Sequence, residues 1–253
     1  MMSALVFTYL MYSWIALALI MFPVMLFIPA PYGRHTSRNW GPVMVNRLGW
    51  MMMESLSLIA FVIFFILSPE EKSLPLWIMF GLWVAHYVNR SIIFPLRIRT
   101  SGKVIPVLIV ALGIIFNAIN GWSNGWYLGS GLGNYQLSWL SDPRFISGLI
   151  IFLLGAWINI SSDNILLRLR TKTETGYKIP HGKMFKYISC PNHFGETLQW
   201  CGFAVLCWNL PALAFAIWTA ANLLPRAIAH HKWYRETFPD FPKDRKAFLP
   251  FLL

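Results

Sequence analysis

The sequence predicts an all-α integral membrane protein with seven transmembrane helices in one membrane-embedded domain, and two observations support this. The 253 residues are 57% hydrophobic and only 12% charged, whereas about a quarter of the residues in a soluble domain are charged. Long apolar runs recur along the chain, and a helix needs ~20 mostly apolar residues to cross a bilayer. The net charge of +11 is therefore attributed to membrane topology and a polyanionic ligand or lipid headgroups, and no nucleic acid partner is expected.

The expected spans are apolar runs separated by polar or basic segments. The first run, from Ala4 to Ile28, is too long for the apolar core of a signal peptide, so we interpret it as a retained helix. The last two spans meet at WNLPA, where Pro211 fits the first turn of a new helix; one kinked helix is the alternative. The seven expected spans are residues 4–28, 43–68, 75–97, 104–120, 146–168, 195–208 and 211–228.

The distribution of basic residues predicts the orientation. Of the 21 Lys and Arg residues, 17 lie in segments 29–42, 97–103, 168–194 and after Pro225, which the seven spans place on one side. Cytoplasmic loops carry an excess of Lys and Arg. We therefore expect an outside or lumenal N-terminus and a cytoplasmic C-terminus, in the endoplasmic reticulum of a eukaryote or the inner membrane of a bacterium.

Three patterns that suggest other functions are set aside. The three cysteines are odd in number and form no CxxC pair, so neither a disulfide framework nor a metal site is expected. The GSGLGN stretch at 129–134 follows no expected strand and opens no helix, as a dinucleotide fingerprint would. The pair His230–His231 has no acidic or Cys partner at ligand spacing, so no metal is expected.

Polar side chains inside the expected spans fall on shared helix faces. Such groups are costly in lipid and usually face a bundle interior, a partner or a water-filled cavity. The plain alternatives are an ion pair of Glu54 with Arg47 or Arg90, and a packing network at Asn159 and Asp163. The series with helical spacing are Arg47, Trp50 and Glu54; His86 and Arg90; Asn159, Asp163 and Arg170; Asn192, Glu196 and Trp200; and Asn222, Arg226, His230 and Tyr234.

The positions of these series indicate an enzyme. The groups of the fifth and seventh spans flank the most basic loop, 168–194, and an Arg- and Lys-rich cavity suits a ligand with several phosphates. Glu54 and Tyr87 are expected deeper, where a lipophilic substrate arrives from the bilayer. The pattern thus predicts a soluble anionic cofactor and an apolar substrate. A transporter is an alternative, although no internal repeat is visible.

The C-terminal part of the chain closely resembles the steroid 5α-reductase family. The upstream stretches PYGRHTS and HYVNRSIIFPL and the context of Glu54 also agree. From about Asn159 to Leu253 the matching stretches are NISSDNILLRLR, GYKIPHGKMFKYISCPNHFGETLQW, LPALAFAIWTAANLLPRAIAHHKWY and FPDFPKDRKAFLPFLL.

The resemblance implies a seven-helix reductase that uses NADPH to saturate the Δ4 double bond of 3-oxo-Δ4 steroids, with hydride going to C5 and a proton to C4. It implies no obligate protein partner, and a steroid that enters from the membrane. Residues 1–145 would form mainly the substrate pocket and 146–253 mainly the cofactor site.

The resemblance also implies roles for particular residues. Glu54 and Tyr87 match the catalytic pair that engages the 3-keto oxygen, and Trp200 is expected in the substrate pocket. Tyr32 and Trp50 match positions near the cofactor and substrate. The positions expected to contact the cofactor are Asn159, Asp163, Arg170, Tyr177, Lys178, Asn192, Arg226, His230 and Tyr234.

Two departures from the family bear on specificity. Lys178 stands where the best-known members have Arg, which binds phosphate in a more bidentate way. The fourth span lacks an Arg associated with those members near Ala111 or Leu112. Because that region would line the steroid pocket, the substrate preference is left open.

The implied chemistry is physically consistent. Hydride addition to the β-carbon of an enone develops negative charge on the carbonyl oxygen, which preorganised donors stabilise in a water-poor site. The Tyr87 hydroxyl can donate, and Glu54 can donate when burial keeps it protonated. Alternatively, an ionised Glu54 orients Tyr87.

Two related enzyme classes are kept as alternatives. One is a methyltransferase of the isoprenylcysteine carboxyl type, which binds S-adenosylmethionine and has a similar C-terminal segment with Arg and His. The other is a reductase of the same superfamily that acts on an enoyl-CoA or polyprenol substrate.

Overall fold

The computed structural model describes residues 3–28, 31, 33–36, 38–98, 102–169 and 176–253. The chain divides into two units. Unit 1 comprises Met1–Pro29 and Ile146–Leu253, and unit 2 comprises Ala30–Phe145.

Unit 2 is built on two long helices, α2 (Asn46–Ile66) and α5 (Val107–Gly129), which pack against each other. A third helical run, Leu74 to Arg97, consists of α3 (Leu74–Val88), a π-helical turn (Asn89–Ile93) and α4 (Phe94–Arg97). Short 3₁₀ helices occupy Gly33–His35, Arg38–Trp40 and Leu137–Ser141.

A small ribbon not foreseen in the sequence ties the starts of α2 and α5 together. Strand β1 (Val43–Val45) pairs antiparallel with β2 (Val104–Pro106). The Asn46 amide donates to Lys103 O at 3.1 Å, and the Val107 amide donates to Pro42 O at 2.8 Å. The helices therefore begin three residues after the expected span starts at 43 and 104, because the ribbon takes up the β-branched residues first.

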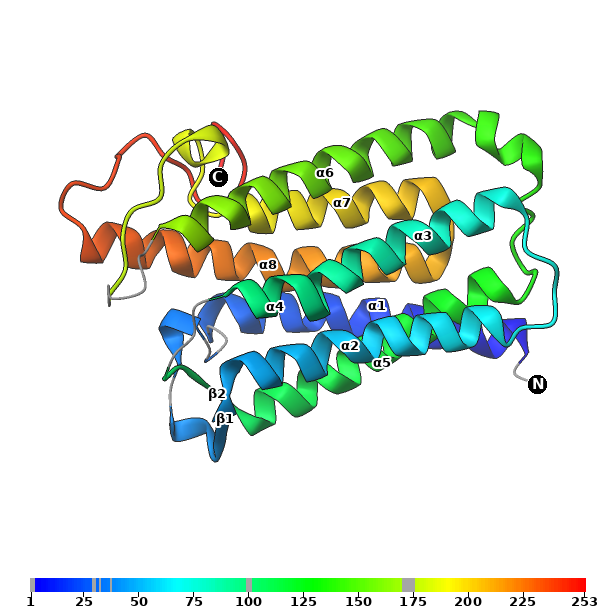
Figure 1. Cartoon of the computed structure of the whole chain (residues 1–253), viewed down its shortest axis with the longest axis horizontal. Helices are drawn as coiled ribbons and strands as arrows, with labels where there is room; N and C mark the ends of the chain where they lie inside the picture. Colours follow the sequence, from blue (N-terminus) through cyan, green and yellow to red (C-terminus); the bar gives the residue numbers. More distant parts are fainter. Residues whose placement is uncertain (1–2, 29–30, 32, 37, 99–101, 170–175) are drawn as a thin grey trace. The chain divides into compact units, whose positions relative to one another are not determined.

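Unit 1 contains α1 (Ala4–Phe27), α6 (Pro143–Arg168) from Ile146 onward, α7 (Pro191–Cys207) and α8 (Leu210–Thr237), with a 3₁₀ helix at Lys183–Lys186. Helix α1 lies along α8 (Figure 1), and the Trp218 indole N–H donates to Trp14 O at 2.9 Å. Helices α7 and α8 lie side by side as a hairpin (Figure 1). The alternative of one kinked helix is therefore wrong.

Two residues make the α7–α8 turn. Trp208 follows α7 in the left-handed conformation, with φ of 47°. The side chain of Asn209 then caps α8, since its Oδ1 accepts the Ala212 amide at 2.9 Å, as expected for Asn at a helix N-cap. Pro211 sits in the first turn of α8, where its missing N–H has no cost.

Glycines bring α6 and α7 into backbone contact. A Cβ on Gly148 or Gly155 would clash with the α7 backbone at Leu206 or Gln199. Conversely, a Cβ on Gly195 would lie 2.5 Å from Asn159 N, and one on Gly202 would clash with the α6 backbone. Only residues without a side chain permit this approach, which is the packing mode of many membrane helices.

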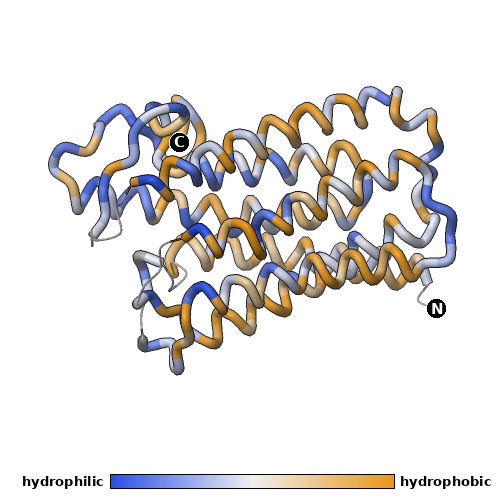
Figure 2. Tube along the Cα trace, in the orientation of Figure 1, coloured by the Kyte–Doolittle hydropathy of each residue, from blue (hydrophilic) through white to orange (hydrophobic). Residues whose placement is uncertain are grey.

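Five helices of the described chain are long and apolar enough to cross a membrane: α1, α2, α5, α6 and α8. Hydrophobic residues run along these helices, whereas hydrophilic residues gather in loops and at helix ends (Figure 2). The expected spans 75–97 and 195–208 are also helical, at α3–α4 and α7. The described part of the chain is thus mostly helical and multi-pass, and the GSGLGN stretch begins at Gly129, the last residue of α5, and continues as a loop over residues 130–134.

Candidate active site

Unit 2 places the expected catalytic pair on two neighbouring helical runs. Glu54 lies half-buried in the third turn of α2, and Tyr87 is 2% exposed near the end of α3. The Tyr87 ring packs against Trp83 at 5.2 Å and His86 at 5.1 Å between ring centroids. These rings fix the orientation of the Tyr87 side chain in an apolar surrounding.

A π-helical turn follows directly after Tyr87. The amide of Phe94 donates to Asn89 O, five residues earlier, and the Ser91 hydroxyl donates to Tyr87 O at 2.6 Å. Pro95 explains the wider turn, because its ring would clash with the carbonyl of Ser91 in a regular α-helix. Such turns often occur at functional sites, and here Pro95 is the sequence signal that could have revealed it.

The turn also positions a buried cation beside the helices that carry the expected catalytic pair. The Arg90 guanidinium lies 5.4 Å from the Trp50 ring and 5.0 Å from the Phe94 ring, and Arg90 is buried. Both distances are those of cation–π contacts. The Arg47 guanidinium donates to Ile98 O at 2.8 Å. The ring of Trp50, a residue expected near the cofactor, therefore packs against the buried Arg90 guanidinium.

Unit 1 brings together the polar faces of α6 and α7. The Asn159 amide donates to Asn192 O at 2.9 Å, and Glu196 Oε2 lies 3.5 Å from the same nitrogen. Asp163, one turn further along α6, is buried as well. The close glycine packing at Gly195 makes these contacts possible, since it brings the Asn159 backbone against α7.

Helix α8 carries the third polar face of unit 1. Arg226 and His230 are half-buried, and Tyr234 is buried. The His230 ring lies 5.6 Å from the His193 ring of α7, and the Tyr234 ring stacks on Phe241 at 5.3 Å. His193 was not singled out in the sequence, although its position next to Asn192 at the start of α7 was a usable signal.

The loop before α7 and the tail after α8 are joined by backbone contacts. Ile188 and Lys246 form a parallel bridge, and the Ser189 hydroxyl lies 2.7 Å from His231 Nδ1 and 3.1 Å from Lys246 O. Buried Arg245 donates to Pro180 O at 3.2 Å and lies 5.0 Å from the Phe241 ring. Burial lowers the pKa of Arg245 below its usual value. The tail is therefore folded onto unit 1.

The remaining expected residues are placed as follows. Tyr177 is half-buried with its ring 5.1 Å from Trp233, whereas Lys178 is exposed. Trp200 is buried and packs on Phe215, with ring centroids 4.5 Å apart. Tyr32 and Arg170 lie outside the described residues.

The described residues of unit 1 fit a nicotinamide dinucleotide. Carboxylate and amide groups at Asp163 and Asn159 suit ribose hydroxyls and a carboxamide, and the Arg226 guanidinium suits a phosphate. The aromatic rings of Tyr177 and Trp233 offer flat surfaces for a base. Across the described chain no group of three His, Cys, Asp or Glu side chains is placed to hold a metal ion.

Comparisons with known proteins give a consistent result. A family model described as 3-oxo-5-alpha-steroid 4-dehydrogenase matches residues 103–253. The chain is 40% identical over 248 residues to 3-oxo-5-alpha-steroid 4-dehydrogenase 1 of Bos taurus, covering 96% of each chain. It is 37% identical over 230 residues to steroid 5-alpha-reductase DET2 of Gossypium hirsutum, covering 89% of each.

A third relative, steroid 5-alpha-reductase DET2 of Arabidopsis thaliana, is 38% identical over 232 residues, covering 89% of this chain and 88% of the relative. The matches to these three relatives cover 89–96% of the chain and therefore extend through both units, whereas the family model matches residues 103–253. The chain belongs to the 3-oxo-5-alpha-steroid 4-dehydrogenase (steroid 5-alpha-reductase) family.

Proposed function

We propose that this protein is an NADPH-dependent membrane reductase that saturates the Δ4 double bond of 3-oxo-Δ4 steroids to give 5α-reduced 3-oxo steroids. The observation that carries the proposal is the match to the steroid dehydrogenase of Bos taurus over 96% of both chains. The polar faces of α6, α7 and α8 support it, because they supply groups that suit a dinucleotide.

On the substrate side, Tyr87 and Glu54 act on the steroid carbonyl. The Tyr87 hydroxyl donates a hydrogen bond to the 3-keto oxygen, and Glu54 completes the polar end of this site. As the β-carbon is reduced, negative charge accumulates on the oxygen, and the hydrogen bond strengthens. The apolar packing of Tyr87 against Trp83 keeps water away and makes that bond more effective.

On the cofactor side, unit 1 binds and orients the dinucleotide. Arg226, together with Arg170 and Lys178, neutralises phosphate charge, while Asn159 and Asp163 hold hydroxyl and amide groups. A bound NADPH supplies the hydride. Asn159 is already fixed on Asn192 O, so this part of the site is preorganised and loses little entropy when the cofactor binds.

For the membrane arrangement we propose seven spans, with α3–α4 and α7 added to the five long apolar helices. The basic loop before α7 and the tail after α8 then lie on the cytoplasmic side, where NADPH is available. The steroid reaches the substrate site from the bilayer.

Product analysis tests this proposal. The purified protein in nanodiscs is supplied with NADPH and a panel of 3-oxo-Δ4 steroids, and products are identified by mass spectrometry. A mass gain of two hydrogens, and loss of enone absorbance, are expected for at least one steroid. Turnover only of an enoyl-CoA or polyprenol-derived substrate would assign a different branch of the superfamily. Binding of S-adenosylmethionine without binding of NADPH would refute the reductase.

A further inference from the structure

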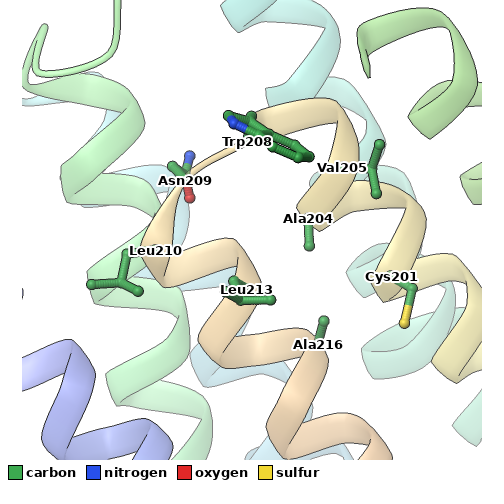
Figure 3. A pocket seen from close by; sticks show the side chains of 8 residues that line it. All are labelled: Cys201, Ala204, Val205, Trp208, Asn209, Leu210, Leu213 and Ala216. Atoms are coloured by element: carbon green, nitrogen blue, oxygen red, sulfur yellow. The ribbon is translucent and has the colours of Figure 1, made fainter. Parts of the chain in front are cut away.

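The α7–α8 hairpin lines an open cavity that none of the expected active-site residues lines. The cavity has a volume of about 470 Å³ and lies at the turn end of the hairpin (Figure 3). Helices α7 and α8 line it on both sides with small or apolar residues. Its principal lining residues are Cys201, Ala204, Trp208, Asn209, Leu213 and Ala216.

The cavity opens on the outward side of the hairpin. Trp208 is 60% exposed, Leu213 is 46% exposed and Cys201 is exposed. By contrast, the neighbouring Trp200 and Phe203 point to the interior and are buried. The described residues that line the cavity carry no charge, so in a bilayer this side of the hairpin meets hydrocarbon rather than an aqueous ligand.

A strained residue forms one end of the cavity. Trp208 adopts the left-handed conformation, which is unfavourable for a bulky side chain and which Gly usually supplies after a helix. Strain of this kind often marks a place where the side chain itself is needed. Here the Trp208 side chain borders the cavity, and the capping bond that the Ala212 amide donates to Asn209 Oδ1 fixes the turn behind it.

We propose that this cavity binds one acyl chain of a membrane phospholipid. Its volume is within the range of small-molecule sites, about 300–1,000 Å³. The polar side-chain atoms of Trp208 and Asn209 lie at the turn end of the cavity. In membrane proteins Trp is enriched at the membrane–water interface, where lipid headgroups and ester bonds lie. The chain end of the lipid then runs past Ala204 and Ala216 toward Cys201.

The distribution of polar groups distinguishes this occupant from a steroid. A 3-oxo steroid is rigid and carries its polar carbonyl at one end and commonly another oxygen at the far end. The far end of the cavity offers only the Cys201 thiol, which is a weak donor. A flexible hydrocarbon chain with one polar end matches the lining better. This site is separate from the proposed reductase function and does not depend on it.

Photo-crosslinking tests the proposal. The protein is placed in nanodiscs of phosphatidylcholine that contains a fraction of phosphatidylcholine with a diazirine on one acyl chain. After irradiation and proteolysis, mass spectrometry quantifies labelled peptides. Label on the segment 201–216 should exceed label on the lipid-exposed face of α1 about tenfold, which corresponds to a preference of about 1.4 kcal/mol.

Two substitutions of different kinds separate a lipid site from a structural role. Ala204→Phe fills the cavity and should reduce labelling of 201–216 to the level of α1, whereas the exposed Ala16→Phe on α1 is the matched control and should leave it unchanged. Trp208→Gly should also reduce labelling, yet it should not lower the melting temperature, because Gly relieves the left-handed strain. If Ala204→Phe fails to fold, Leu213→Trp at the exposed rim replaces it.

Three results would overturn the proposal. The first is labelling of 201–216 no greater than that of α1, which would make Trp208 an interfacial anchor only. The second is labelling that survives in the folded cavity-filling variant. The third is loss of labelling when a 3-oxo-Δ4 steroid is added to wild-type nanodiscs, which would assign the cavity to steroid.

Discussion

The two units pack their central helix pairs in different ways. In unit 1, glycines on both α6 and α7 meet the backbone of the other helix at two levels: Gly148 opposite Gly202, and Gly155 opposite Gly195. In unit 2, only one end of the α2–α5 pair is packed like this. A Cβ on Gly121 or Gly125 would lie 2.5 Å from a carbonyl oxygen of α2, at Ser57 or Phe61 respectively.

At the other end of the α2–α5 pair, glycines meet side chains instead. A Cβ on Gly113 would contact the Met53 thioether, and one on Gly49 would lie 2.8 Å from methyl groups of Ile105 and Val110. Met53 is next to Glu54. Backbone contacts cannot adjust, whereas a methionine side chain can. We infer that the proposed cofactor unit is rigid and that the proposed substrate unit is adaptable near Glu54, its proposed catalytic residue.

The largest effect is expected for the two residues of unit 2 that are proposed to act in catalysis, and it should fall on turnover and not on cofactor binding. Glu54→Gln and Tyr87→Phe should each lower kcat about 100-fold or more, because they remove stabilisation of the developing oxyanion. The dissociation constant of NADPH should change little, since neither residue is among the expected cofactor contacts, most of which lie on unit 1. Steady-state product formation and NADPH titration measure the two effects, with Tyr9→Phe on exposed α1 as control. Full activity of Glu54→Gln would show that the catalytic assignment is wrong.

The reverse pattern is expected for Arg226. Arg226→Ala should weaken NADPH binding about 10- to 100-fold, because a charge-assisted hydrogen bond contributes about 1.5–3 kcal/mol. Isothermal titration with NADPH measures this loss. Arg235, exposed on the same helix, gives the control Arg235→Ala, which should bind normally. Equal effects of the two substitutions would indicate that only the overall positive charge of α8 matters.

A matched pair of glycine substitutions tests the difference in packing directly. Gly155→Ala places a methyl group against the α7 backbone and should destabilise the protein by about 1–3 kcal/mol. It should also weaken NADPH binding, because Asn159 and Asn192 would move apart. Gly113→Ala should be close to neutral, because Met53 can change rotamer and Ala favours a helix. Thermal unfolding in detergent gives both values, and a larger loss for Gly113→Ala would contradict the comparison.

The smallest effect concerns acid stability at the edge of unit 2. Two hydrogen bonds from the Arg144 side chain and one from its amide lower the pKa of Asp142 from 3.8 to about 2. Because the folded pKa is the lower one, this contribution to stability is complete above about pH 4 and is lost as the pH falls toward 2. Melting temperatures of wild type and Asp142→Asn should therefore differ slightly at pH 5 and converge near pH 2. A constant difference would contradict this cause.

The sequence predicted the helical segments well, and the errors have specific physical causes. Helix α5 continues to Gly129 instead of ending near 120, since polar and small residues lower the hydropathy while Gly121 and Gly125 pack on α2. Helix α8 continues to Thr237, beyond the expected end at 228, where the chain no longer needs to be apolar. The β1–β2 ribbon is too short to give a pattern of alternation.

The candidate site was predicted on each unit separately, because helical spacing defines a face without identifying its neighbour. Spacing placed Asn159 and Asp163 on one face, but the bond from Asn159 to Asn192 depends on glycines of another helix. The buried Arg245 was not foreseen among the basic residues that follow Pro225. Its bond to Pro180 O joins residues 65 positions apart in the chain, a separation that no local pattern reports.

The pairing of α1 with α8 constrains the order in which the protein can assemble. Unit 2 is one continuous stretch of chain, so its helices can pack as soon as they have been inserted into the membrane. Unit 1 takes its first helix from the start of the chain and that helix's partner, α8, from near the end. Helix α1 is therefore surrounded by lipid until the roughly 180 residues between it and α8 have been synthesised. The side chains of α1 are apolar on nearly all sides, so the helix is stable in lipid before its partner is present. A polar substitution on the α1 face that meets Trp218 would therefore reduce the yield of folded protein during synthesis more than it destabilises the finished molecule.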